Sequence, residues 1–142
     1  MEPAWIEFVK WPYEEHTWHL QVTVADGGFG ARQEVYADEA HLFEFADALV
    51  GFPRSLSDSV SLEIGKRDPK WAHWLLLHAH VVDGVGHAGL VVETSANGIG
   101  PHRREAHFVV RCEAASLNTL GSELRKWLSS ADTACRVELK NG

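Results

Sequence analysis

The hydrophobic pattern of this chain changes its period, and this change constrains the fold more than any other feature. Apolar and polar residues alternate over 18–24, which is the two-residue period of a strand with one buried face. Twice the pattern takes the period of a helix with one apolar stripe, over 38–49 and 116–128. Further strands are predicted over 5–10, 31–36, 59–64, 71–82, 87–94, 105–113 and 136–139. Many strands interrupted by only two helices predict an α+β fold.

These elements predict one sheet in one domain. The 142 residues fit a single domain, 1–142. Trp11-Pro12 is expected to end the first strand, because proline cannot donate a hydrogen bond to a ladder. Asp38 is expected to cap the first helix. We therefore predict a mainly antiparallel sheet of about seven or eight strands, with two amphipathic helices packed on one side.

An apolar pattern in the first half of the chain recurs 75 residues later. Both copies combine a strand, a turn and an amphipathic helix. Two equivalent halves would produce this pattern, and so would any strand followed by a helix that faces the core, so both explanations stay open. The matching positions are Val35, Leu42, Phe45, Leu49 and Phe52 in the first copy, and Val110, Leu117, Leu120, Leu124 and Trp127 in the second.

The charge of the chain is acidic, with 13 Lys and Arg residues against 20 Asp and Glu residues and a net charge of −7. This balance argues against nucleic acid and anionic membranes as partners, and it suits a basic protein partner. No apolar run approaches the roughly 20 residues of a membrane-spanning helix, and the first residues carry no secretory signal pattern. We therefore expect a cytoplasmic protein in which Cys112 and Cys135 are reduced. The sequence does not indicate the oligomeric state.

Histidine is the most over-represented residue with possible chemistry, at nine positions. If Asp83-Gly84 forms a two-residue hairpin loop, His80 faces His87 and His78 follows on the same face. Three imidazoles could then hold zinc and support a metal-dependent enzyme. A longer loop would disperse them and leave exposed or structural histidines. The chain has no H-E-x-x-H pair, phosphate-binding glycine loop or nucleophile motif, so we predict no catalytic residue and favour a protein that is not an enzyme.

Six tryptophans favour a contact surface, because large aromatic side chains dominate binding hot spots. Complete packing of all six in the core is the alternative, and an aromatic pocket between sheet and helices would instead suit a small ligand. The predicted contact residues are Trp11, Tyr13, Glu14 and Glu15 near the start of the chain, and Trp74 with Glu93 on the polar side of the later hairpin.

The order of elements over about residues 17–130 resembles a group of small bacterial proteins of uncharacterised function. Some relatives of that type look like immunity proteins, which are encoded beside secreted toxins and neutralise them by binding. The resemblance implies a cytoplasmic protein-binding module without enzymatic activity, and it assigns no functional residue. The features that carry it are Val35-Tyr36, the helix with Leu42, Phe45 and Leu49, the strand 60–64, Gly86-His87 leading into 88–93, and the closing helix with Leu117, Leu120 and Leu124.

Overall fold

The structure is a computed structural model that describes residues 3–68 and 70–141. The first half of the chain forms β1 (Ala4–Glu14), β2 (Thr17–Ala25), β3 (Gly30–Asp38), α1 (Glu39–Val50) and β4 (Ser59–Gly65). The second half forms β5 (His73–Val81), β6 (His87–Ala96), the short 3-10 helix η1 (Gly100–His102), β7 (Arg104–Glu113), α2 (Ala114–Leu128) and β8 (Ala134–Leu139). The predicted α+β class with antiparallel strands and two helices is confirmed.

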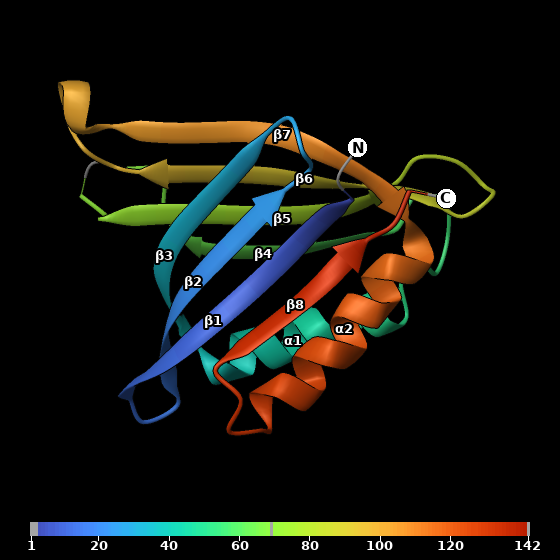
Figure 1. The fold of residues 1–142 in the computed structure, drawn as a ribbon, viewed down its shortest axis with the longest axis horizontal. Helices are drawn as coiled ribbons and strands as arrows, with labels where there is room; N and C mark the ends of the chain where they lie inside the picture. The colour runs from blue at the N-terminus through green and yellow to red at the C-terminus, as the bar shows by residue number, and fades with distance from the viewer. Residues whose placement is uncertain (1–2, 69, 142) are drawn as a thin grey trace.

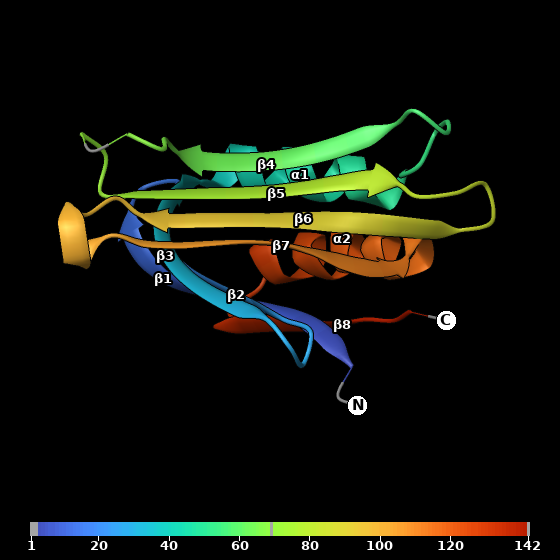
Figure 2. The same cartoon turned by 90° about the horizontal axis from the view of Figure 1, so that it is seen from above.

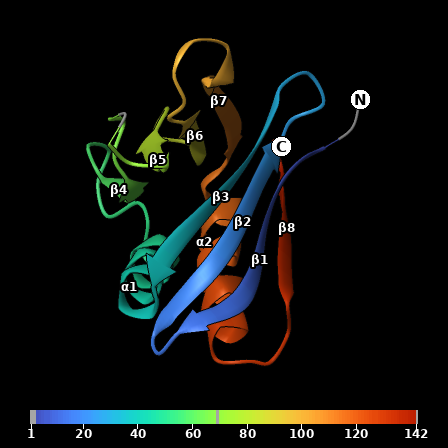
Figure 3. The same cartoon turned by 90° about the vertical axis from the view of Figure 1, so that its left-hand side faces the viewer.

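The strands form two sheets of four, and the prediction of a single sheet is wrong. Sheet A has the order β3-β2-β1-β8 and sheet B has the order β4-β5-β6-β7, with antiparallel pairing throughout. Figure 3 shows sheet A as one layer, with sheet B and the two helices on its inner side. Alternation shows that a strand has one buried face, but it does not show which strands pair. Hence the sequence predicted the number of strands better than their partners.

Each half of the chain has the same architecture. Three consecutive strands are followed by a helix, and the fourth strand pairs with the first strand of the other half, β4 with β5 and β8 with β1 (Figure 1). The two meanders also share their register, because Thr17 pairs with Asp38 before α1, and His87 pairs with Glu113 before α2. The 75-residue pattern in the sequence therefore marks two structurally equivalent halves.

The core lies between the two sheets and the helices, which run side by side beneath sheet B (Figure 2). The predicted helical stripes are buried: Leu42, Phe45 and Leu49 on α1, and Leu117, Leu120, Leu124, Trp127 and Leu128 on α2. Burial of each large apolar side chain stabilises the fold by about 1.5–3 kcal/mol. Neither described helix is long and apolar enough to cross a membrane.

Two local predictions at the ends of elements are wrong. β1 continues through Pro12 to Glu14. The last contact on its β8 side is the Lys10 N–H to the Thr133 carbonyl, and no described strand pairs with that edge beyond it, so Pro12 interrupts no ladder there. Asp38 stands at the N-cap position of α1 but makes no side-chain cap bond. Its carboxylate instead accepts a hydrogen bond from the Thr17 hydroxyl at 3.2 Å.

Candidate functional site

A row of aromatic side chains crosses the open face of sheet A, which is the face turned away from the core. Trp11 on β1 is the register partner of His19 on β2, and His19 is the partner of Tyr36 on β3. Their ring centroids lie 5.2 Å and 4.9 Å apart, and the Tyr13 ring lies 4.6 Å from Tyr36. We call Trp11, Tyr13, His19 and Tyr36 the aromatic row.

The alternation of β1 explains why two of these rings point outward. Ile6, Phe8 and Lys10 face the core, so the odd-numbered residues beyond them lie on the open face. Trp11 is 39% exposed and Tyr13 is 56% exposed. Together with Tyr36, which is 45% exposed, they form an apolar surface that the described chain leaves uncovered.

Acidic side chains surround the aromatic row. Glu14 and Glu15 are exposed at the adjacent β1–β2 turn, and the Glu34 carboxylate lies 3.9 Å from His19 Nε2. The charge of the chain is concentrated in this half: residues 1–71 hold 6 Lys and Arg against 13 Asp and Glu, a net −7, whereas residues 72–142 hold 7 of each. The predicted contacts Trp11, Tyr13, Glu14 and Glu15 lie at one end of the β1–β2 hairpin, and Glu34 adds a further carboxylate beside the row.

His73 extends the row toward sheet B. Its ring centroid lies 5.9 Å from that of Tyr36, and its Nδ1 atom is buried without a hydrogen-bond partner. Burial lowers the pKa of His73, because the charged imidazolium loses its hydration. His73 thus presents a neutral ring beside the aromatic row near neutral pH.

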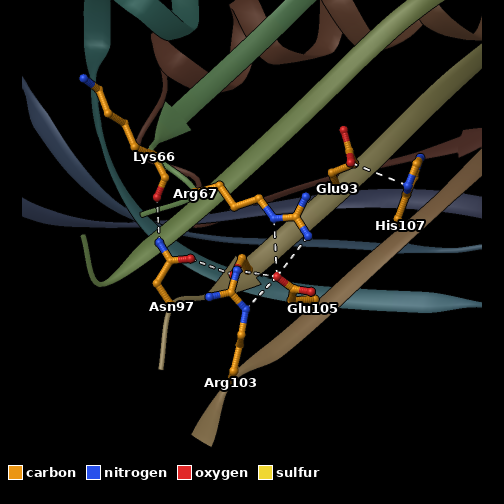
Figure 4. A network of polar contacts seen from close by, with 8 residues as sticks. Lys66, Arg67, Glu93, Asn97, Arg103, Glu105 and His107 are labelled. Atoms are coloured by element: carbon orange, nitrogen blue, oxygen red, sulfur yellow. Dashed lines mark hydrogen bonds and ion pairs between the residues drawn. The ribbon is translucent and has the colours of Figure 1, made fainter. Parts of the chain in front are cut away.

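The other two predicted contacts, Trp74 and Glu93, lie on the open face of sheet B and do not join the aromatic row. Trp74 is only 8% exposed, and its Nε1 donates a 2.8 Å hydrogen bond to Glu63. Glu93 lies 3.5 Å from His107 Nδ1, at the border of a polar network around Glu105 (Figure 4). Trp74 is therefore a packed residue that Glu63 orients, so little of its ring is available to a partner.

The β5–β6 hairpin has the longer of the two loops that the sequence left open. His80 pairs with Gly89, and the Val82 N–H donates to the carbonyl of His87, the first residue of β6, so the loop spans residues 83–86. The Asp83 carboxylate closes this loop: it accepts the backbone N–H groups of Val85 and His87 and lies 2.6 Å from His87 Nδ1. These contacts hold the pKa of Asp83 below its usual value.

The three histidines proposed as zinc ligands consequently separate. The rings of His78 and His80 lie on one face with centroids 6.1 Å apart, and His78 Nδ1 is hydrogen bonded to Ser61 Oγ. His87 is engaged by Asp83. Within residues 3–68 and 70–141, no three side chains of His, Cys, Asp or Glu are arranged to hold a metal ion.

Comparison with known protein families, with curated proteins and with solved structures finds no match to this chain. The resemblance to immunity-type proteins stays a prediction.

A cavity of about 280 Å³ lies at the loops after α1 and β5, where Phe52, Leu56, Val81 and His87 contribute to its lining. It is formed by loops at the end of sheet B, so it differs from the aromatic pocket between sheet and helices that would suit a small ligand. Cys112 and Cys135 are buried free thiols, and burial raises the pKa of each to about 11. Both thiols are therefore protonated and poorly reactive near neutral pH.

Sequence reasoning missed His19, Tyr36 and His73 as members of this surface. His19 occupies a polar position in the clearest predicted strand, and Tyr36 ends a strand with a weak apolar signal. Their shared row depends on the register of three strands, which the sequence pattern does not specify. The outward positions of Trp11 and His19 in their predicted strands were the signal in the sequence that could have indicated this surface.

Proposed function

We propose that this protein binds another protein through the aromatic row and its acidic surroundings, without itself making or breaking bonds. The observation that supports this proposal is the contiguous exposure of Trp11, Tyr13 and Tyr36 on a hydrogen-bonded sheet. Such rings cover much apolar area and lose little side-chain entropy on binding, which is why they dominate hot spots. A sheet face holds them in place before the partner arrives, which reduces the cost of ordering.

We propose a basic partner, because three carboxylates lie beside the row and the whole chain has a net charge of −7. Glu14, Glu15 and Glu34 would attract cationic side chains at the rim while the rings desolvate the centre. Opposite charge mainly accelerates encounter, and raising the salt concentration weakens this steering. Neutralisation of a basic toxin is the specific form of this function that the resemblance suggests.

The decisive test removes the two large rings that flank His19 in the row. The double variant Trp11→Ala/Tyr36→Ala should bind a basic partner, captured from the native host by the wild-type protein, about 30-fold less tightly, the effect of losing a hot spot. His80 on β5 and Arg111 on β7 flank Gly89 in sheet B as Trp11 and Tyr36 flank His19 in sheet A. The matched control His80→Ala/Arg111→Ala should bind like the wild type. Equal capture by the wild type and the Trp11→Ala/Tyr36→Ala variant would refute the proposal.

Two further measurements make this test specific. Both double variants should unfold within about 1 kcal/mol of the wild type, because the altered side chains lie outside the core. For the immunity-type role, wild-type protein should relieve the toxicity of the product of a neighbouring toxin gene, and the Trp11→Ala/Tyr36→Ala variant should not. Rescue by both proteins would assign neutralisation to another surface.

A further inference from the structure

The outer edge of β3 carries backbone groups that no strand of the described chain pairs. Within residues 3–68 and 70–141, β2 is the only ladder partner of β3. The Asp26 N–H donates to the Phe29 carbonyl at 3.0 Å, and these residues continue the β2–β3 register. Hydrogen-bonded and non-bonded pairs alternate in an antiparallel ladder, so Gln33 bonds to β2, whereas the peptide groups of Arg32 and Glu34 point to the free edge.

A groove runs along this edge. β3 passes the inner side of sheet B and contacts β4, β5 and β6 (Figures 1 and 3). The resulting groove has a volume of about 520 Å³ and is bounded by residues 30–34 on one side and by the ends of β6 and β7 on the other. Thr94, Ala96 and Ala106 line the second side, and their small side chains leave room beside the edge.

The groove is locally basic in an acidic protein. Arg32 and Arg104 line it, and neither forms an ion pair among the described residues. The Glu105 carboxylate is already taken by two guanidinium groups, at 3.1 Å from Arg67 and 2.6 Å from Arg103 (Figure 4). Glu34 is therefore the one other carboxylate that lines the groove.

We propose that an extended acidic peptide segment of a partner protein binds in this groove and pairs with β3 as an added strand. The Arg32 peptide group and the Glu34 N–H provide the backbone hydrogen bonds, whereas the Glu34 carbonyl already accepts the Gln33 side-chain amide at 3.0 Å. Arg32 and Arg104 attract the carboxylates of the peptide. Addition of a strand to an exposed edge is an established mode of peptide recognition. This site uses the edge of sheet A and does not depend on the function proposed for the aromatic row.

The first test measures backbone protection. The probe is a short capped peptide of alternating valine and glutamate, and the matched control peptide replaces each glutamate with lysine. The glutamate peptide should slow amide hydrogen exchange at Arg32 and Glu34 about tenfold, because these N–H groups gain partners. Gln33, which already bonds to β2, should change little. Unchanged exchange at Arg32 and Glu34, or equal binding of the lysine peptide, would overturn the proposal.

The second test substitutes exposed residues and leaves the core side chains unchanged. Glu34→Pro removes one free N–H and should weaken binding of the glutamate peptide about tenfold, whereas Glu34→Ala should bind as tightly as the wild type or more tightly. Arg104→Ala should weaken binding about threefold, the effect of one exposed charge pair, and Arg111→Ala should not. Equal losses for Arg104→Ala and Arg111→Ala would indicate non-specific attraction and contradict the site. If Glu34→Pro does not fold, the comparison of Arg104→Ala with Arg111→Ala and the hydrogen exchange at Arg32 and Glu34 still test the proposal.

Discussion

The open faces of the two sheets carry different side chains at positions that are equivalent in register. In sheet A the row contains Trp11, His19 and Tyr36, and at the equivalent register positions sheet B has His80, Gly89 and Arg111. These outward side chains do not enter the core, so the shared architecture leaves them free to differ. The comparison shows that the repeat determines the scaffold, while each open face carries its own surface chemistry.

Most inward positions are apolar in both halves, and Lys10 is the charged exception. Phe8 and Leu77 are equivalent and both are fully buried, but Lys10, which is 5% exposed, occupies the place that Ala79 has in the other half. Lys10 Nζ donates to the carbonyls of Trp127 and Ser130 at the end of α2. Its pKa is lowered because burial disfavours the ammonium ion, although nearby acidic groups oppose this effect.

The backbone carbonyls at the end of α1 accept hydrogen bonds from a different side chain. Asn118 on α2 donates its side-chain amide to the carbonyls of Leu49 and Phe52, at 2.9 Å and 2.6 Å. Thus the neutral Asn118 amide donates to carbonyls at the end of α1, and the buried Lys10 ammonium donates to carbonyls at the end of α2. Each side chain adds a donor to carbonyls at or just beyond the end of a helix, where the Leu49 and Trp127 carbonyls also accept the backbone N–H groups of Phe52 and Ser130.

Replacing Lys10 with alanine, the residue at the equivalent position 79, should have the largest effect on stability. Lys10→Ala removes two charge-assisted hydrogen bonds and leaves a cavity beside Trp18 and Trp127, so we expect a loss of about 3–4 kcal/mol in the free energy of unfolding. Urea denaturation measures this loss. The exposed Lys126→Ala control should change stability by less than about 0.5 kcal/mol. A loss for Lys10→Ala no larger than that of the control would show that the cap is dispensable.

The next largest effect is expected where α1 and α2 pack against each other, at two equivalent positions of the two halves. Gly121 on α2 corresponds to Ala46 on α1, and a Cβ atom at Gly121 would lie 2.7 Å from the Ala46 carbonyl oxygen. Gly121→Ala must push the helices apart, so we expect a loss of about 2–3 kcal/mol. Ala46→Gly, which makes both positions glycine, should cost only about 1 kcal/mol through helix propensity. Thermal unfolding of the two variants compares them, and similar losses would contradict a steric limit at Gly121.

A smaller effect is expected at the row of sheet B, where the His80 ring lies over Gly89. A Cβ atom at Gly89 would lie 2.6 Å from His80 Cε1, so Gly89→Ala should displace the imidazole and cost about 1 kcal/mol. The double variant Gly89→Ala/His80→Ala should recover most of this loss, because the obstructing ring is gone. A double-mutant cycle in urea measures the coupling. Strictly additive losses would mean that the ring does not restrict Gly89.

The smallest expected effect is at the residue before the second strand of each half. His16 and Gly86 both have positive φ, at 65° and 94°, and their carbonyls accept the first N–H of α1 and α2 at 2.8 Å. Only glycine adopts this backbone region without strain, so His16→Gly should stabilise the protein by about 0.5 kcal/mol and Gly86→Ala should destabilise it by about 1 kcal/mol. Chemical denaturation of the matched pair gives both signs. Destabilisation by His16→Gly would indicate that the exposed imidazole contributes more than the strain costs.

Part of the candidate site was accessible from the residues alone. Trp11, Tyr13, Glu14 and Glu15 were predicted as contacts and lie together on one surface, because all four belong to one hairpin end and neighbours in sequence stay neighbours in space. Trp74 belongs to another sheet and is packed against Glu63. Such grouping of residues from distant segments depends on pairing between strands.

The histidines illustrate the same limit. Asp83-Gly84 indicated a turn, yet the Asp83 side chain bonds to the backbone as far as His87 and makes the loop longer. A shift in register changes which side chains face each other across the whole hairpin. His80 therefore faces Gly89, and the expected cluster does not form.

By itself, the order of residues determined the α+β class, the buried stripes of both helices and the 75-residue recurrence, because periodicity is a local consequence of backbone geometry. Tertiary structure alone decided that the strands divide into two sheets and that each half contributes its last strand to the other. It also decided that Trp11, His19 and Tyr36 share a row. The physical reason is that an unpaired strand edge can accept many partners, and only the joint burial of both inner faces selects among them.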